Sequence, residues 1–386
     1  MKCICENDNW EYLDGIRSKE YWIDRDILDY KNPHIGFKIC QDCGYVSYDS
    51  RPNLEEHYRR DYRKLVNAGN IVTTNRKVEY HKHFLADWLK ENLQHGVSVL
   101  DYGCAHGQFL SWLAKNHFTS GKLCGYELTE GFVNFGRNYY GLDIVSKKEP
   151  DEKPETYDLI IIYHTLEHLE YPVKTLSSLR DALKNDGVIY LSVPVWFESC
   201  DEASGQATVD FENLFHLNHC NVYSRNSIRN TIALCGLEIV KEDDQIYGHT
   251  FLLKKSTAKK VIIAKDDHAK IKDIIMRQQA AIHYYNQGDP VKSLEIYPDY
   301  PDAYTFNAIK NHMKDFNAQK EIYERGLDVC QSKAKLYQAL GGLYLQWDGL
   351  GAIKPGEPQR RYTNQVQKAE AIYNTLLSVK PTNEIS

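Results

Sequence analysis

The sequence lacks the features that define several large classes of protein. Its apolar runs, such as residues 159–163, are far too short to cross a bilayer. The first residues, Met1–Glu6, do not contain the apolar core of a secretory signal. There is no excess of basic residues, because 47 lysines and arginines face 53 aspartates and glutamates. We therefore expect a cytoplasmic protein with no membrane partner, and we do not expect nucleic acid as a partner.

What is present is the composition of an ordinary globular protein. The chain has 386 residues, of which 42% are hydrophobic and 26% are charged. At about 150 residues per domain, roughly two to three domains are expected. The 10 cysteines, in a chain with no expected secretion signal, indicate a reducing compartment. In that setting, closely spaced cysteines favour a metal site over a disulfide.

Two close pairs of cysteines lie within residues 1–60, a segment that we otherwise expect to be irregular. Four thiolates are a ligand set of structural zinc, and the second pair has the Cys-x-x-Cys-Gly pattern of a zinc ribbon. The first pair is more tightly spaced, His34 is an alternative ligand, and ordinary reduced cysteines are the competing interpretation. The predicted zinc ligands are Cys3, Cys5, Cys40 and Cys43. We interpret the other cysteines as small buried residues, namely Cys104, Cys124, Cys200, Cys220, Cys235 and Cys330.

Strand and helix patterns alternate over residues 97–253. A helix is expected before them, over 76–93, where apolar residues recur at helical spacing. Further helices are expected over 108–116, 131–139, 172–184 and 224–234. The expected strands are 97–102, 122–127, 143–145, 157–163, 187–193, 237–240 and 250–253. This alternation predicts an α/β fold with a mostly parallel sheet covered by helices on both faces.

The pattern changes after Lys254. Residues 268–380 indicate helices without a convincing strand, and they contain a weak repeat. Three residues recur at an offset of 33, since Tyr304, Ala308 and Asp315 are matched by Tyr337, Gly341 and Asp348. This offset is typical of tetratricopeptide-type helical hairpins, and ordinary helices are the alternative. We expect an all-helical domain over 265–386 that serves for a protein partner or for self-association.

The most informative segment joins the first strand of the sheet to the next helix. It reads Asp-x-Gly-x-x-x-Gly from Asp101 to Gly107. Glycines at the carboxyl end of a strand let the backbone approach a ligand. The dinucleotide fingerprint Gly-x-Gly-x-x-Gly fails here, because Cys104 and Ala105 follow the first glycine. The pattern therefore favours a ligand that lacks a pyrophosphate.

The next strand ends in an acidic residue, Glu127, which follows Asp101 by one strand–helix–strand unit. A carboxylate at this position accepts hydrogen bonds from both ribose hydroxyls in dinucleotide-binding folds. An ordinary solvated strand end is the alternative for Glu127, and a loop acid or helix cap is the alternative for Asp101.

Further motifs follow in a characteristic order. The apolar strand over 157–163 leads into His164-Thr165-Leu166-Glu167-His168, the segment 183–187 has a leucine–basic–x–x–glycine pattern, and 216–219 reads His-Leu-Asn-His. In this order the motifs resemble class I S-adenosylmethionine-dependent methyltransferases over residues 75–255. The last phrase resembles the subgroup related to ubiquinone-biosynthesis O-methyltransferases and sugar methyltransferases.

The resemblance implies a Rossmann-like, seven-stranded methyltransferase sheet over 75–255. It lies between an N-terminal zinc-ribbon-like module over 1–60 and the all-helical, tetratricopeptide-like domain over 265–386. The resemblance also implies S-adenosylmethionine as the cofactor. The cofactor-binding residues are then expected to be Asp101, Tyr102, Gly103, Cys104, Ala105, Gly107, Glu127, Leu128 and His164.

Methyl transfer to a hydroxyl, an amine or an acidic carbon is helped by a base. The candidate catalytic residues are His164, Glu167 and His168, which follow the strand over 157–163. On a loop entering a helix, the two histidines would share one face with Glu167 beside them. One interpretation is a general base, since histidine titrates near neutrality. The second is a divalent metal site, and the third is a structural brace. His216 and His219 could also reach this place.

The leading functional hypothesis is methyl transfer to a small molecule, most of all a sugar or sugar-nucleotide type hydroxyl or carbon. An N-terminal module with four cysteines also precedes the catalytic domain in some sugar-nucleotide methyltransferases. The alternative is methylation of a protein or RNA docked by the C-terminal helices. A scaffold without catalysis is disfavoured, because the cofactor motifs are complete.

Overall fold

The structure is a computed structural model that describes most of the chain in separate stretches. The described residues are 3–13, 36–48, 83–92, 96–116, 121–146, 153–196, 215, 219–245, 248–258, 261–330, 333–350, 368–369, 371–372 and 374–375. The predictions concerning His34, Cys200, His216 and the helix start over 76–82 lie outside them. The chain divides into two compact units, and residues 1–196, 212–243 and 248–268 form the first.

A seven-stranded mixed sheet is the centre of the first unit, as the sequence predicted. The strand order is β10-β11-β8-β7-β4-β5-β6. Pairing is parallel from β8 through β7, β4 and β5 to β6, and antiparallel between β8 and β11. The bounds are β4 Val99–Tyr102, β5 Leu123–Tyr126, β6 Asp143–Val145, β7 Tyr157–Tyr163, β8 Leu183–Val193, β10 Leu237–Gln245 and β11 Gly248–Lys255.

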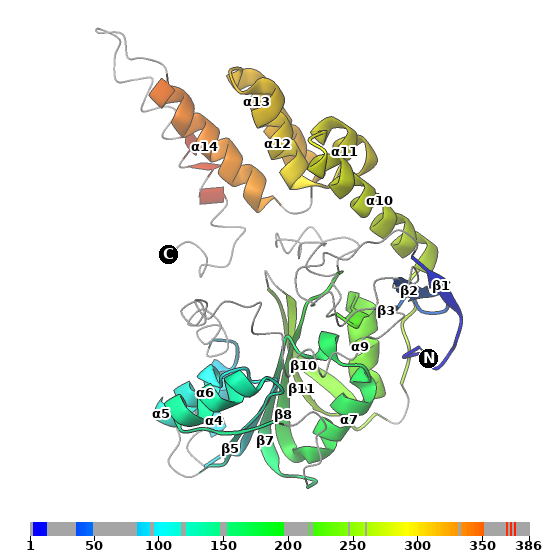
Figure 1. The fold of residues 1–386 in the computed structure, drawn as a ribbon, viewed down its shortest axis with the longest axis vertical. Coiled ribbons are helices and arrows are strands. Elements are labelled where there is room, and N and C mark those ends of the chain that lie inside the picture. The colour runs from blue at the N-terminus through cyan, green and yellow to red at the C-terminus, as the bar shows by residue number, and fades with distance from the viewer. Residues whose placement is uncertain are drawn as a thin grey trace. The chain divides into compact units, whose positions relative to one another are not determined.

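Helices cover both faces of this sheet, because its central strands are apolar on both sides. Figure 1 shows α4, α5 and α6 on one side of the sheet and α7 and α9 on the other. In β7, residues 159–162 are at most 1% exposed, as a doubly covered strand requires. The helix bounds are α4 Ala86–Asn92, α5 Gln108–Asn116, α6 Glu130–Tyr140, α7 Pro172–Ala182 and α9 Arg225–Leu234.

Several predicted boundaries are wrong, and β10 runs to Gln245 rather than to residue 240. The helix expected to run to residue 184 ends at Ala182, and β8 begins at Leu183 rather than at Gly187. The reason is tertiary pairing: Leu183 is buried and pairs with Tyr157 of β7, so this contact overrides the local helical pattern.

The N-terminal cysteine segment is not irregular, which corrects that expectation. It forms the strands β1 Trp10–Tyr12, β2 Phe37–Cys40 and β3 Val46–Tyr48. A fourth strand, β9 Asn221–Val222, comes from far along the chain and pairs antiparallel with β3. These short strands carry little sequence signal, and they pair with one another, while β9 supplies partners along the outer edge of β3. The small sheet and the large sheet belong to one compact unit, and the module boundary 1–60 stays a prediction.

From residue 269 on, the described elements of the second unit are helices, and several of these helices share a core. The bounds are α10 His268–Asn286, α11 Pro290–Ile296, α12 Pro301–His312, α13 Phe316–Val329 and α14 Ala334–Leu350. Asp289 and Asp315 cap two helices, since each side chain accepts a hydrogen bond from the helix's third backbone N–H. The repeat positions Tyr304 and Ala308 are buried against Tyr323 and α14. The tetratricopeptide-like character and the limits 265–386 stay predictions.

None of the described helices is both long and apolar enough to serve as a membrane span.

The helical core predicts opposite effects of the same substitution at two helical glycines. A Cβ atom at Gly342 would meet nothing within 4 Å, whereas one at Gly326 would lie 3.0 Å from both Tyr304 Cγ and Leu336 Cδ1. Gly342→Ala should therefore raise the free energy of unfolding by about 0.5–1 kcal/mol through helix propensity. Gly326→Ala should lower it by about 0.5–2 kcal/mol, because overpacking outweighs that gain. Urea unfolding followed by circular dichroism measures both, and equal stabilisation by the two variants would contradict this packing.

Candidate functional site

The cofactor motifs meet at the carboxyl edge of the large sheet. Strands β4 and β5 are parallel neighbours, with Asp101 paired to Gly125 and Tyr102 to Tyr126. Asp101 and the end of β5 therefore lie at the same level of the sheet. Because ligands of open α/β sheets bind beyond the carboxyl ends of the strands, this edge is the candidate site.

The loop over 103–107 leaves β4 in a strained path. Gly103 and Gly107 have φ of 82° and 77°, and Ala105 has φ of 49°. A Cβ atom at Gly103 would lie 2.2 Å from Thr165 Oγ1, so the close neighbour that requires this glycine is a protein side chain. The glycine was expected because of a ligand, and the structure adds a second reason. The loop is held in place by the backbone of Gly103 and Cys104, whose N–H groups both donate to the Tyr126 carbonyl.

Glu127 is fixed by two backbone donors. Its Oε2 accepts from the Ala105 N–H at 3.0 Å, and its Oε1 accepts from the Thr129 N–H at 2.8 Å. Burial raises the pKa of this carboxyl, while these backbone hydrogen bonds lower it. A carboxylate has room for about four hydrogen bonds, and the Leu128 N–H and the Thr129 hydroxyl also act on this one. Ribose hydroxyls are donors of the kind that a carboxylate fixed in this way accepts.

A second buried acid lies close by. Asp101 is 6% exposed, and burial, followed by the charge of Glu127, raises its pKa to about 7. Two carboxyl groups that disfavour each other's charge make this edge attractive for a cation. Of the other predicted cofactor residues, Tyr102 and Cys104 are buried and Leu128 is half-buried.

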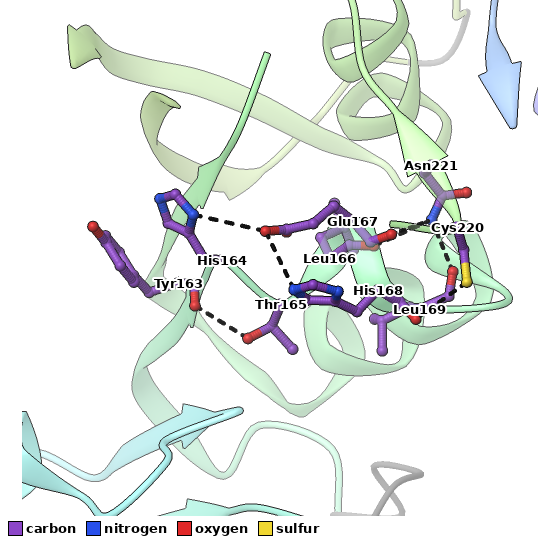
Figure 2. Close-up of polar contacts among 9 residues, drawn as sticks. All are labelled: Tyr163, His164, Thr165, Leu166, Glu167, His168, Leu169, Cys220 and Asn221. Carbon is purple, nitrogen blue, oxygen red and sulfur yellow. Dashed lines mark hydrogen bonds and ion pairs between the residues drawn. The ribbon is translucent and has the colours of Figure 1, made fainter. Parts of the chain in front are cut away.

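The candidate catalytic residues lie on the 3₁₀ turn η3, Leu166–His168, and just before it. Figure 2 shows Glu167 between the two histidines. Glu167 Oε1 is 3.7 Å from His164 Nδ1 and 3.7 Å from His168 Nε2. The Glu167 side chain is 1% exposed, against 27% for His164 and 22% for His168. A buried carboxylate thus faces two half-buried imidazoles.

The expected common helical face for the two histidines is wrong. His164 has φ of 48° and precedes the turn, while its N–H donates to the Ser192 carbonyl of β8. The turn is 3₁₀ rather than α, so residues four apart do not stack one above the other. The side chains come together through Glu167 instead.

His219 joins this group from the segment before β9. Its ring centroid lies 4.8 Å from that of His168. Ligand atoms of Glu167, His168 and His219 all lie within 4.8 Å of one another, a donor set that suits a divalent transition metal. His216, the other candidate in that segment, lies outside the described residues.

Sequence reasoning missed the residues that hold η3. Asn221 Nδ2 faces the carbonyls of Leu166, Glu167 and Leu169 at 3.3, 3.3 and 2.8 Å, and Tyr45 Oη donates to Asn221 Oδ1. No periodic pattern could have indicated this pair, because 176 residues separate its members.

The four predicted metal ligands do come together. Cys3 Sγ is 3.4 Å from Cys43 Sγ, and Cys5 Sγ is 3.7 Å from Cys40 Sγ. All four sulfur atoms lie within 4.8 Å of one another, and none is in a disulfide. A tetrahedral zinc with Zn–S bonds of about 2.3 Å would hold sulfurs about 3.8 Å apart. The donor set and its spacing fit zinc, and we name these residues the cysteine cluster.

Proton sharing within the cysteine cluster also suits a metal. The hydrogen bond between Cys3 and Cys43 lowers the pKa of Cys43 to about 6 and raises that of Cys3. Burial raises the pKa of Cys40 to about 12. Cys3 and Cys40 therefore keep their protons without metal, and a metal ion would displace these protons.

The family comparison concerns the sheet and its site. Residues 74–242 match the family model described as "Methyltransferase domain". This segment, 169 of the 386 residues, is similar to methyltransferase domains. It contains the 103–107 loop, Glu127, η3 and Asn221, and the prediction of an enzyme is confirmed at this level. A search of curated proteins found no match.

Solved methyltransferase structures are similar to part of the chain. A SAM-dependent methyltransferase from Aquifex aeolicus is 21% identical, with 44% of this chain and 87% of that chain covered and a TM-score of 0.34. One from Leishmania major is 19% identical, with 48% and 75% covered and a TM-score of 0.37. A putative methyltransferase from Bacillus halodurans is 16% identical, with 41% and 71% covered and a TM-score of 0.34.

The raised pKa of Asp101 predicts how the stability of the methyltransferase domain depends on pH. Because folding raises the pKa of Asp101 from 3.8 to about 7, the folded state binds the proton more tightly. The gain in the free energy of unfolding that results from this tighter proton binding is fully present below pH ~4 and is lost as pH rises to ~7. The loss amounts to at most about 4 kcal/mol.

Asp101→Asn mimics the protonated acid and should remove that loss. We expect the variant to be more stable than the wild type at pH 8 and equally stable at pH 4, by denaturant unfolding followed through tryptophan fluorescence. Parallel stability curves for the two proteins across this pH range would contradict the assignment.

Proposed function

We propose that the protein transfers a methyl group from S-adenosylmethionine to a small-molecule acceptor of the sugar or sugar-nucleotide type. The observation that carries the proposal is the Glu127 carboxylate, which backbone donors fix at the carboxyl edge of a sheet that is similar to methyltransferase domains. When bound, S-adenosylmethionine supplies a methyl group on a cationic sulfonium.

Each part of the edge has a role in this proposal. Glu127 holds the two ribose hydroxyls, and its charge-assisted hydrogen bonds make it the main anchor. The 103–107 loop contacts the methionine portion. Asp101, beside Glu127, adds negative potential where it is ionised, and a cationic ligand would favour its ionised form.

The residues at η3 serve the acceptor. In-line displacement needs the acceptor atom held about 3 Å from the methyl carbon, and a hydroxyl acceptor also needs a base. His164 and His168 are the candidate bases, and the buried Glu167 carboxylate between them orients an imidazole and stabilises its protonated form. A divalent ion on Glu167, His168 and His219 is the alternative, and it predicts that chelators abolish turnover.

Two features of the N-terminal sheet support the proposal of a small, polar acceptor. The four-cysteine module resembles that of some sugar-nucleotide methyltransferases, and its fourth strand, β9, adjoins η3 through Asn221. We propose that the cysteine cluster holds one structural zinc ion. The competing candidate, methylation of a docked protein or RNA, is favoured by one observation: the helical unit has a core of its own and need not serve the sheet.

The experiment that tests this function uses S-adenosylmethionine labelled in its methyl group. The full chain is incubated with small-molecule, protein and RNA fractions, and label transfer is counted in each. The proposal predicts label in the small-molecule fraction, with sugars and sugar nucleotides as the first pure acceptors to test. Label in protein or RNA would instead favour the competing candidate, and no transfer despite cofactor binding would contradict an active enzyme.

Substitution of Glu127 should weaken cofactor binding strongly. In Glu127→Gln the negative charge is lost, and an amide N–H₂ replaces one oxygen that accepts from a backbone N–H. At roughly 1.5–3 kcal/mol for each charge-assisted hydrogen bond, the affinity for S-adenosylhomocysteine should fall about 10- to 1000-fold. Calorimetry measures it, with Glu130→Gln as an exposed control on α6. Unchanged affinity in folded Glu127→Gln would remove Glu127 from the site.

The zinc proposal predicts about one zinc ion per chain in protein purified without chelators. Replacing both Cys40 and Cys43 by serine should abolish zinc binding and loosen the N-terminal sheet, because structural metal binding is coupled to folding. Cys235→Ser, at a buried cysteine outside the cluster, is the matched control and should keep the metal. Metal analysis that finds no zinc in the wild type would refute a structural zinc site.

A further inference from the structure

A tight turn joins the cysteine cluster to strand β3. The turn carries Cys40 and Cys43 and is closed by a hydrogen bond from the Gly44 N–H to the Cys40 carbonyl at 2.8 Å. The Cys40 N–H donates in return to the Tyr45 carbonyl at 2.9 Å. Tyr45 follows the turn directly and is 3% exposed. The geometry of the thiols and the position of the Tyr45 side chain are therefore set together.

Tyr45 in turn contacts the amide that holds η3. Three carbonyls of the η3 region face one end of the Asn221 amide, so that end must be the N–H₂ donor. The other end is then the oxygen, and it accepts from the Tyr45 hydroxyl. Asn221 is 1% exposed, and its orientation is fixed at both ends.

The contacts that Asn221 makes are those of a helix cap. The last carbonyls of any helix lack partners within the helix. In η3 the Asn221 amide serves the carbonyls of Leu166, Glu167 and Leu169, while the thiol of Cys220 donates to the His168 carbonyl at 3.5 Å. Figure 2 shows Asn221 and Cys220 side by side against the turn. The residues of β9 and its approach thus satisfy one end of the turn that carries Glu167 and His168.

We propose that Asn221 is a positioning residue for the η3 turn, and that the metal state of the cysteine cluster acts on Glu167 and His168 through Tyr45 and Asn221. This rests on the proposed function, because it gives Glu167 and His168 their part in methyl transfer. A zinc ion would rigidify the turn that ends at Tyr45, which keeps the Asn221 amide aimed at the η3 carbonyls. Loss of the ion would release the turn without touching the cofactor edge.

Tyr45→Phe tests the link in the full chain, since it removes one hydroxyl and keeps the aromatic ring. Hydrogen exchange of a peptide covering 164–171 should become about threefold to tenfold faster, the change expected for one lost hydrogen bond. The ring NMR signals of His168 and His219 should move at constant pH. Exchange in β4 and β5 and the affinity for S-adenosylhomocysteine should stay unchanged.

Ser47→Ala is the matched control. The Ser47 hydroxyl donates to the Cys220 carbonyl at 3.0 Å, so this variant also loses a buried hydrogen bond between β3 and the β9 segment. It does not remove a contact with η3, and its 164–171 exchange and histidine signals should match the wild type. Equal effects of Tyr45→Phe and Ser47→Ala, or no effect of Tyr45→Phe, would overturn the positioning role.

Metal removal tests the second half of the proposal. A chelator is added to wild type and to Tyr45→Phe, zinc release is measured, and exchange is recorded. Zinc loss should speed 164–171 exchange in the wild type and add little in Tyr45→Phe, where the link is already cut. Unchanged 164–171 exchange after zinc loss, exchange that rises equally in β4 and β5, or protein purified without zinc would each overturn control by the metal. The proposed function fails separately, by absence of cofactor binding or methyl transfer in the wild type.

Discussion

The site depends on a half-buried carboxylate held by backbone donors from two different segments. Glu127 accepts from Ala105 in the loop after β4 and from Thr129 at the start of α6. One side chain thereby fixes the loop, the end of β5 and the entry into a helix. Desolvation of an ionised group is costly unless hydrogen bonds compensate it, and the raised pKa of Glu127 reflects that balance. With Asp101 beside it, the edge is prepared for hydroxyl donors and for a cation.

The η3 side of the candidate site has a different construction. Glu167 and His168 lie on a single 3₁₀ turn, which makes few internal hydrogen bonds and needs outside support. Asn221 and Cys220 provide it from the small N-terminal sheet. The edge around Glu127 is therefore stabilised from within the large sheet, while η3 is stabilised by residues of β9, which pairs with β3. Under the proposal made above, η3 would respond to the N-terminal sheet while the edge around Glu127 stays fixed.

Much of the fold could be predicted because it depends on local patterns. The helix over 108–116 and the strands over 143–145 and 157–163 were predicted with the bounds that the structure has, since apolar periodicity and flanking turns define them. The start of β8 at Leu183 and the N-terminal strands could not be predicted, because pairing with distant strands decides their structure. The site divides in the same way: motif spacing brought Asp101, Glu127 and the four cysteines to notice, whereas the bond from Tyr45 to Asn221 joins residues too far apart for any local signal.

The most direct test of the central claim is a hydrogen-exchange footprint of S-adenosylhomocysteine on the full chain. Bound cofactor should slow exchange in the backbone over 101–107 and 123–129, where the Glu127 hydrogen bonds join the loop to the strand end. The helices α10–α14 should not change. Protection confined to the helical unit, or no protection at saturating ligand, would contradict a cofactor site at this edge of the sheet.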